Sequence, residues 1–149
     1  GGTGETIAGD MKKRADGNKM AAATETDERS SITSSISSES LVQAIARAAG
    51  DKKAADIVIL DMKDICSYTD YFLICSGRSA RQTKAIADGI RATIKEKGPV
   101  PPRMAGEARG DWVLLDYLSV VVHVFTPETR EFYRLEVLWK EAPRIGVAG

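Results

Sequence analysis

Hydrophobic positions along the chain change their pattern near residue 39, and this change divides the sequence into a polar segment and a folded unit. Before that point Gly, Ser, Thr, Ala and mixed charges surround isolated isoleucines with no sustained period. Such a segment buries too little apolar surface to offset the entropy lost on ordering. The pattern predicts a disordered tail over 1–38, one domain over 39–145 and a short tail over 146–149.

Apolar residues recur at helical spacing in three parts of the domain. The spacing predicts helices over 40–50 and 79–97, the second with three isoleucines along one face and a charged opposite face. A third helix is predicted to open at Thr126 or Pro127. Its predicted apolar side consists of Phe132, Leu135, Leu138 and Trp139.

Four short apolar runs are typical of strands. The segments 55–61 and 70–76 are apolar on both faces, which predicts a sheet covered on both sides. The segments 112–116 and 120–125 predict an antiparallel pair joined through 117–119. The resulting order, αββαββα, predicts an α/β (α+β) fold in which a small mixed β-sheet is flanked by helices.

Composition narrows the class of protein. Lys plus Arg and Asp plus Glu each number 21, so bulk electrostatic binding to nucleic acid is not expected. Cys66 and Cys75 lack the spacing of a zinc or redox motif, which favours a reduced intracellular setting. No apolar run approaches the roughly 20 residues that span a bilayer, and no apolar stretch typical of a signal peptide appears in this sequence. We therefore expect a soluble, cytoplasmic protein.

Side chains for catalysis are scarce. His123 is the only histidine and lies inside a predicted strand, so we expect a structural or interface histidine rather than a general base. One histidine and two cysteines do not assemble a closed zinc site. Asp111 and Asp116 are five residues apart along a strand, which places them on opposite faces. We expect no catalytic residue, no metal and no cofactor.

The segment Ser76-Gly77-Arg78-Ser79 follows a strand and opens a helix, a position where backbone N–H groups can receive an anion. It is shorter than a phosphate-binding glycine loop, and a helix-capping turn is the preferred interpretation. A nucleotidyltransferase would need closely spaced acidic residues after this turn to hold magnesium, and none follows Ser79. A small enzyme of that type, using Ser76-Gly77 with Asp111 or Asp116, is kept as the alternative.

Cationic residues follow the exposed face of the second helix. We expect a solvated face, with contact to the phosphate backbone of a large assembly as the alternative. The residues that form this stripe are Arg81, Lys84, Arg91 and Lys95. In the third helix we expect solvated positions at Glu128, Arg130 and Glu131.

From about Leu41 to Ile145 the chain resembles the ribosomal silencing factor (Iojap) family. The blocks that carry the resemblance are ADIVILDM, YTDYFLICSGRSARQTKAIAD, DWVLLD and VVVHVFTPETREFYRLEVLW, in that order. The last two are the most specific. One departure is Leu118-Ser119, where the family has Gly-Asp, which places an apolar side chain at a predicted bend.

The resemblance implies a translation regulator and not an enzyme. Family members bind the large ribosomal subunit through its protein fourteen and block joining of the small subunit, and organelle relatives are assigned a role in large-subunit assembly. The implied fold is a nucleotidyltransferase-like core without catalytic acids. The family also includes homodimers, so self-association of the free protein is open.

Both faces of the predicted strand 120–125 are apolar, and the domain's own core accounts for one of them. For the other face we expect a macromolecular partner, because exposed apolar patches of several hundred Å² mark interaction sites. The alternative is that Trp112 and His123 lie under the C-terminal helix. The predicted partner-binding residues, as surface or as its immediate support, are Trp112, Asp116, Tyr117, Val121, His123 and Phe125. Arg81 and Lys84 are the candidates for a peripheral contact with ribosomal RNA.

Overall fold

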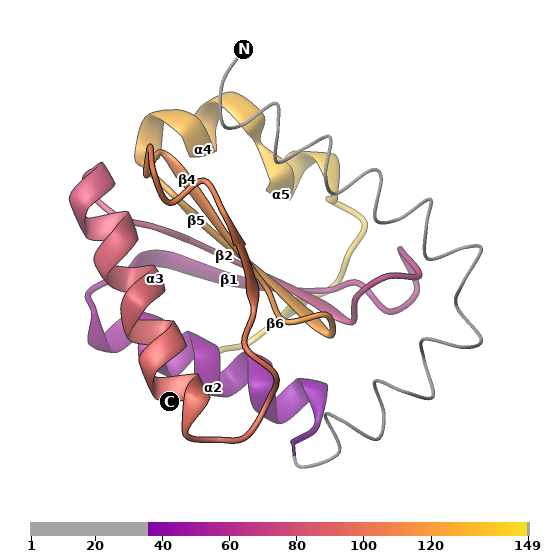
Figure 1. The fold of residues 1–149 in the computed structure, drawn as a ribbon. Helices are drawn as coiled ribbons and strands as arrows, with labels where there is room; N and C mark the ends of the chain where they lie inside the picture. Colours follow the sequence, from indigo (N-terminus) through magenta and orange to yellow (C-terminus); the bar gives the residue numbers. More distant parts are fainter. Residues whose placement is uncertain (1–35, 149) are drawn as a thin grey trace.

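The computed structural model describes residues 36–148 and folds them around one mixed sheet (Figure 1). Its elements are α2 (Ser38–Asp51), β1 (Ala55–Asp61), β2 (Tyr71–Ser76), α3 (Ala80–Lys95), β3 (Arg103–Ala105), β4 (Trp112–Asp116), β5 (Val120–Phe125), α4 (Pro127–Tyr133), α5 (Leu135–Leu138) and β6 (Arg144–Ile145). The sheet has six strands in the order β3-β4-β5-β2-β1-β6. β2 and β5 run parallel at its centre, and every other neighbouring pair is antiparallel.

Helices lie on both faces of the sheet. Figure 1 shows α2 and α3 on one face and α4 and α5 on the other. The first face is closed by a buried cluster that joins α2 and α3 to Ile59, Leu73 and Val122. A second cluster joins Leu60 and Phe72 to residues of the α4–α5 segment and beyond. The predicted fold class, a small mixed sheet flanked by helices, is confirmed.

The helix starts are fixed by serine caps. The Ser37 hydroxyl accepts a hydrogen bond from the backbone N–H of Ser40 at 3.1 Å, and the Ser79 hydroxyl accepts one from Gln82 at 3.2 Å. Each cap satisfies a backbone donor that a helix leaves unpaired in its first turn. These caps agree with the helices predicted from the sequence to within a few residues.

Two edge strands were not predicted. β3 and β6 are three and two residues long, too short to produce an alternating pattern. β6 pairs with β1, and beyond it the amide side chain of Gln43 bonds to the backbone of Gly146 and Ala148. Residues 146–148, predicted as a tail, are therefore held against α2.

The predicted N-terminal tail lies almost entirely outside the described residues. Of the range 1–38, only 36–38 are described. Ser38 is already the first residue of α2, so the folded unit starts one residue before the predicted boundary.

The C-terminal helix is divided in two, which overturns part of the predicted apolar side. Arg134 adopts a left-handed conformation with φ of 47°, and this ends α4 and starts α5. The break shifts the helical phase. Leu135 is buried and Trp139 half-buried as predicted, but Phe132 and Leu138 are 78% and 66% exposed, so their predicted inward placement is wrong.

No helix among the described residues is long and apolar enough to cross a membrane. Cys66 is half-buried, Cys75 is buried, and neither is part of a disulfide. Burial raises the pKa of Cys75 to about 12. Because the thiolate is the reactive form of cysteine, Cys75 is not placed to act as a nucleophile.

Candidate partner-binding site

The β4–β5 hairpin collects most of the predicted site residues on one face of the sheet. Its register pairs Trp112 with Phe125 and Asp116 with Val121. His123 lies between them on β5, and side chains two apart on a strand share a face. Tyr117 alone has the opposite parity and belongs to the cluster under α2 and α3.

All six predicted residues are buried. The exposed fractions are 1% for Trp112, 7% for Asp116, 5% for Tyr117, 1% for Val121 and 0% for His123 and Phe125. The expectation that one face of β5 is left open is therefore wrong. Leu135 of α5 and the half-buried Tyr133 and Trp139 pack against that face. The alternative, with Trp112 and His123 under the C-terminal segment, is what the structure shows.

Trp112 and His123 are joined directly. The indole Nε1–H donates to the imidazole Nδ1 at 3.1 Å, so the imidazole proton resides on Nε2. Among the described residues no group accepts a hydrogen bond from Nε2. Burial lowers the pKa of His123 to about 3, and the ring is neutral near pH 7. A sealed, neutral imidazole is a structural group rather than a proton acceptor for a substrate.

An aromatic cluster connects the Trp112–His123 pair to the α4–α5 segment. The ring of Trp112 lies 4.8 Å from the ring centroids of both Phe125 and Tyr133. Phe72 contacts His123 at 4.8 Å and Trp139 at 6.1 Å, both edge-on. These geometries are favourable aromatic arrangements. The position of α4 and α5 on the sheet therefore depends on Trp112 and Phe72.

Asp116 shapes the hairpin turn. Its Oδ1 accepts a hydrogen bond from the backbone N–H of Leu118 at 2.8 Å, and Tyr117 N–H donates to Val120 at 2.9 Å. Leu118 has a φ of 75°, a conformation that favours glycine, which agrees with the Gly that the family resemblance places there. Asp111 lies at the other end of β4, so the two carboxylates do not form a pair.

Tyr117 projects into the core under α2 and α3. Burial raises the pKa of its hydroxyl to about 12, so the phenol is uncharged at neutral pH. It supports the hairpin from the face opposite Trp112.

Three large apolar side chains are exposed on α4 and α5, and sequence reasoning missed them as a surface. Phe132, Val137 and Leu138 are 78%, 59% and 66% exposed. Phe132 contacts Tyr133 edge-on at 5.0 Å between ring centroids, and Tyr133 in turn contacts Trp112. The sequence signal was obscured because an unbroken helix would have turned Phe132 and Leu138 toward the sheet. We call these three exposed side chains the α4–α5 surface. They lie on the segment that covers the buried hairpin.

The turn after β2 is a helix cap. Gly77 N–H donates to Phe125 and Arg78 N–H donates to the Gln82 side chain, at 2.8 and 2.6 Å. The backbone donors that would hold a phosphate are thus engaged inside the protein, as the preferred interpretation predicted. Among the described residues, no group of three or more His, Cys, Asp or Glu side chains is placed to hold a metal ion.

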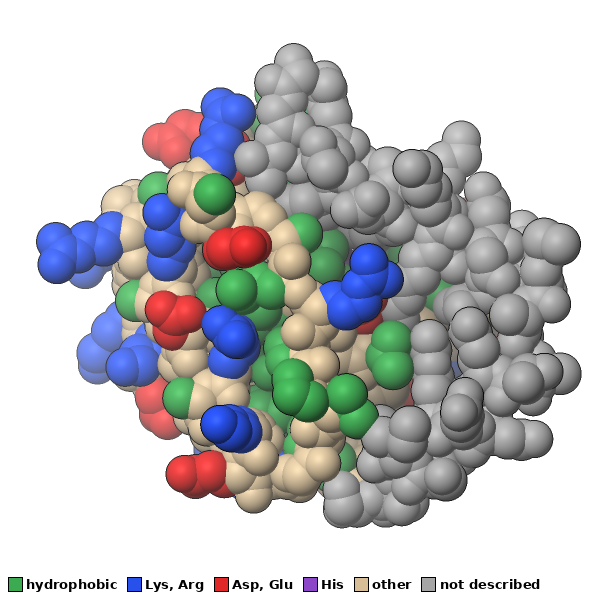
Figure 2. All heavy atoms as spheres, in the orientation of Figure 1, with side chains coloured by type: hydrophobic (Ala, Val, Ile, Leu, Met, Phe, Trp, Pro, Cys, Tyr) green, Lys and Arg blue, Asp and Glu red, His purple; other side chains and the backbone are tan. Residues whose placement is uncertain are grey.

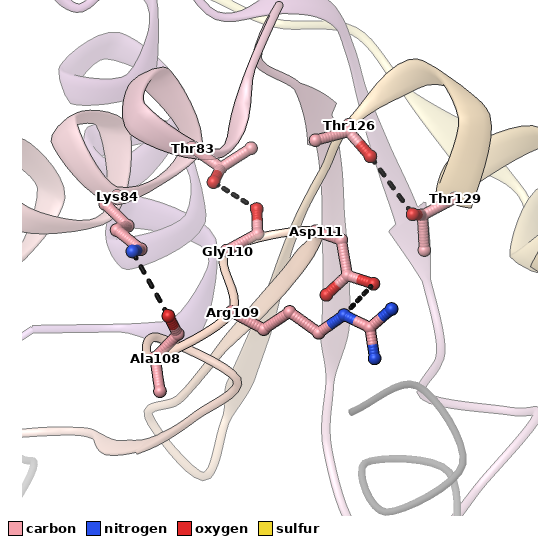
Figure 3. Close-up of polar contacts among 8 residues, drawn as sticks. All are labelled: Thr83, Lys84, Ala108, Arg109, Gly110, Asp111, Thr126 and Thr129. Atoms are coloured by element: carbon pink, nitrogen blue, oxygen red, sulfur yellow. Dashed lines mark hydrogen bonds and ion pairs between the residues drawn. The ribbon is translucent and has the colours of Figure 1, made fainter. Parts of the chain in front are cut away.

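Only some of the cationic side chains of α3 are available for contact with a partner. Lys and Arg side chains gather on the α3 side of the molecule in Figure 2, interspersed with acidic ones. Arg81 is exposed. Lys84 is half-buried, and its Nζ donates to the backbone oxygen of Ala108 at 3.2 Å (Figure 3). Of the two candidates for an RNA contact, Arg81 is the more accessible.

Gly110 fixes the loop that leads into β4, a role that the sequence did not reveal. Its carbonyl accepts a hydrogen bond from the Thr83 hydroxyl on α3 (Figure 3). Its φ is +79°, and an added Cβ would lie 2.9 Å from the Cβ of Ala80 and 2.9 Å from Lys84 Cε. Only glycine permits so close an approach of this loop to α3.

Comparison with known proteins places the whole described region in one family. The family model for ribosomal silencing factor during starvation matches residues 35–149. The ribosomal silencing factor RsfS of Bacillus subtilis is 44% identical over 108 residues, which are 72% of this chain and 92% of that protein. A crystal structure of a protein from Chromobacterium violaceum superposes with a TM-score of 0.69 at 32% identity, covering 76% of this chain and 94% of that chain.

A mouse protein named mitochondrial assembly of ribosomal large subunit protein 1 is 35% identical over 91 residues, which are 59% of this chain and 40% of that protein. The matched family model and the Bacillus subtilis relative are named for the silencing of ribosomes, which defines the class of protein. The chain belongs to the ribosomal silencing factor family.

Proposed function

We propose that this protein binds the large ribosomal subunit through its protein fourteen and sterically blocks joining of the small subunit, so that translation is repressed. Family membership supports the ribosomal role, and the printed name of the mouse relative refers to the large subunit. The cytoplasm is the proposed place of action. The regulatory activity needs a docking surface and no chemical step.

The observation that carries the proposal is the exposed apolar α4–α5 surface. Phe132, Val137 and Leu138 are large side chains held on a segment that is anchored to the sheet. Monomeric proteins rarely expose such groups together without an interaction role. We assign the contact to these side chains.

The six buried residues then act as support rather than as contact. Trp112 packs on Tyr133 of α4, and Phe125 packs on Trp112. Val121 and His123 share the same buried face, whereas Asp116 shapes the turn. A rigid support limits the side-chain ordering that association would otherwise require.

Arg81 is proposed as a peripheral neighbour of ribosomal RNA. It is exposed on α3, and an exposed cation contributes mainly to the rate of association and its salt dependence. Lys84 contributes less in this proposal, because its ammonium already donates to Ala108.

An enzymatic alternative finds little support. A nucleotidyltransferase that uses Ser76 with Asp111 would need further acids to hold magnesium, and among the described residues no group of three His, Cys, Asp or Glu side chains is placed to do so. One that uses Ser76 with Asp116 would need these two side chains together. Ser76 pairs with Phe125 at one end of β5, whereas Asp116 pairs with Val121 at the other. At about 3.4 Å per residue, four residues separate the two ends by roughly 14 Å. We therefore propose a binding protein without catalytic activity.

An assembly factor that uses the same surface is the second candidate, favoured by the name of the mouse relative. The experiment that tests the proposal is co-sedimentation of the purified protein with isolated large subunits, with subunit joining measured in parallel. Binding together with reduced joining supports silencing. Binding to mature subunits without an effect on joining would favour the assembly role, and no binding would overturn both.

Self-association of the free protein is proposed to use the same apolar surface. Sedimentation equilibrium over a range of protein concentrations tests it. A mass that rises with concentration, and that returns to the monomer value when Leu138 is replaced by Glu, is the expected result.

A further inference from the structure

A recess lies beside the α4–α5 segment, outside the buried hairpin. It is a cavity of about 940 Å³ between the beginning of β1, the end of β2 and the α4–α5 segment. β2 and β5 are the parallel pair of this sheet, and Ser76 and Phe125 are their paired last residues. In α/β sheets, ligands bind in crevices at the carboxyl ends of such strands. The volume is that of a site for a small organic ligand.

Cations dominate the lining of this cavity. Its basic side chains are Lys53, Arg78, Arg130, Arg134 and Arg144, and its acidic ones are Asp56, Glu131 and Glu136. Two of the three carboxylates are already paired, Glu136 with Arg130 at 2.8 Å and Glu131 with Arg134. Within the described residues, Lys53, Arg78 and Arg144 have no acidic side chain within 4.0 Å. The cavity therefore attracts an anion.

Arg130 lines the cavity, and hydrogen bonds fix its guanidinium. This differs from the expectation that Arg130 is a solvated helix position. Its side chain is 13% exposed. Nη1 donates to the Ser76 hydroxyl and Nε to Glu136, each at 2.8 Å. A guanidinium has five N–H donors, so others remain for a ligand. Its fork geometry matches phosphate oxygens, and its fixed position lowers the entropy cost of binding.

The backbone around the cavity is strained. Among the described residues four non-glycine residues have positive φ, and Lys53, Asp56 and Arg134, with φ of 65°, 50° and 47°, line this cavity. The β1–β2 register also shifts between Ala55 and Val58. Strained backbone of this kind is concentrated at ligand sites.

The apolar wall of the cavity is formed by Val58, Pro127 and Val137, whereas Ile57 packs toward α2 on the other face of the sheet. A bare phosphate would leave this wall unused, whereas a planar base would cover it. The backbone N–H groups of Gly77 and Arg78 are engaged elsewhere, so side chains would hold the phosphates.

We propose that this cavity binds a purine nucleotide, with its phosphates on Arg78, Arg130 and Arg144 and its base against Val58 and Val137. Binding does not require a metal ion, because cationic side chains supply the countercharge. The site shares Val137 with the proposed ribosome-binding surface, but its test uses the protein without ribosomes, so a failure of either proposal leaves the other standing.

Calorimetric titration of the full chain with ATP and GTP, in buffer with EDTA, tests the proposal. The expected result is saturable binding of at least one of them, with no measurable binding of adenosine or guanosine. Arg78→Gln removes a charge-assisted contact and is expected to weaken binding about tenfold. Arg47→Gln is the control, because Arg47 is also exposed but lies on α2 and does not line the cavity, and the affinity of this variant is expected to be unchanged.

Absence of ATP and GTP binding, or equal losses in the two variants, would overturn the proposal. Pyrophosphate that binds as tightly as either nucleotide would show that the apolar wall receives no base. A short single-stranded RNA that binds more tightly than the nucleotides, with a steep salt dependence, would instead assign the cavity to an RNA backbone. Arg144→Gln, on a different element, repeats the test with a second variant.

Discussion

The indole of Trp112 donates a hydrogen bond to Nδ1 of His123 across the β4–β5 pair, at 3.1 Å and with both side chains almost fully buried. This bond fixes the tautomer of the imidazole. It also holds the two rings in fixed orientations beneath α4 and α5. The helices that carry the exposed α4–α5 surface therefore pack on a cluster that contains one buried polar contact.

Replacing Trp112 by Phe is expected to destabilise the protein. The change leaves the buried Nδ1 of His123 without its donor, and an unpaired buried acceptor costs about 1–3 kcal/mol. Trp139→Phe is the matched control, because the Nε1 of Trp139 has no acceptor among the described residues. Urea unfolding of both variants measures the difference, and equal losses would mean that the hydrogen bond contributes nothing.

His123 is expected to make the protein less stable as the pH falls below about 6.5. Burial lowers its folded-state pKa to about 3, so between these values the unfolded chain binds the proton and the folded chain does not. The free energy of unfolding should fall by about 1.4 kcal/mol per pH unit in this window from His123 alone. Above about pH 6.5, His123 should leave the free energy of unfolding unchanged.

His123→Gln separates this contribution from that of the carboxylates. His123 is the only histidine, so the variant should lose the slope between about pH 6.5 and 5. Denaturant titrations of both proteins at several pH values measure the slopes. The same slope in both would show that His123 is protonated in the folded state.

The central strands and α3 follow from the sequence because local pattern and burial agree there. Ile86, Ile90 and Ile94 are four residues apart and all fully buried. β4 and β5 also have the predicted bounds. In α3 the periodicity decides which face points inward, whereas the unbroken apolar runs of β4 and β5 fit strands that are buried on both faces.

The break in the C-terminal helix could not be predicted from the sequence. A left-handed arginine is unfavourable by local preference, and REFYRLEVLW has the spacing of one helix. Distant contacts accompany the break at Arg134, since Arg130 bonds to Ser76, 54 residues earlier, and to Glu136 beyond it. Tertiary structure decides the phase here, and with it the exposure of Phe132 and Leu138.

The sequence predicted part of the buried cluster on the β4–β5 pair. Trp112, His123 and Phe125 do form one cluster, as their positions in two paired strands predicted. A strand that is apolar on both faces shows that both are covered, but it does not tell whether this chain or a partner covers them. The cations of the cavity come from segments far apart in the sequence, and no local spacing brings them together.

Gly110→Ala is expected to destabilise the protein by about 2 kcal/mol or more. The residue has a φ of +79°, and a Cβ would lie 2.9 Å from the backbone oxygen of Ala80. Gly146→Ala is the control, since nothing lies within 4 Å of a Cβ there. Thermal unfolding of both variants provides the comparison. A melting temperature for Gly110→Ala equal to that of the control would mean that the loop relaxes without cost.

Arg81→Glu is expected to slow association with the large subunit several-fold at low salt and to change the stability little. An exposed charge near nucleic acid acts mainly on the association rate. Arg47→Glu is the control, because it makes the same charge reversal at an exposed position of α2. Stopped-flow association at two ionic strengths measures both. If the two variants associate equally fast, Arg81 has no RNA neighbour.

Phe132→Glu and Leu138→Glu are each expected to weaken binding to the large subunit by about 2 kcal/mol, roughly thirtyfold, because a charge replaces an apolar group at the proposed contact. Both side chains are more than half exposed, so the free energy of unfolding should change by less than about 0.5 kcal/mol. Val100→Glu is the control, since Val100 is 44% exposed but lies outside α4 and α5. Co-sedimentation with large subunits measures the affinity, and urea unfolding measures the stability. Full binding by both folded variants would remove the contact from the α4–α5 surface, whereas a loss shared by Val100→Glu would show that the effect is general to added charge.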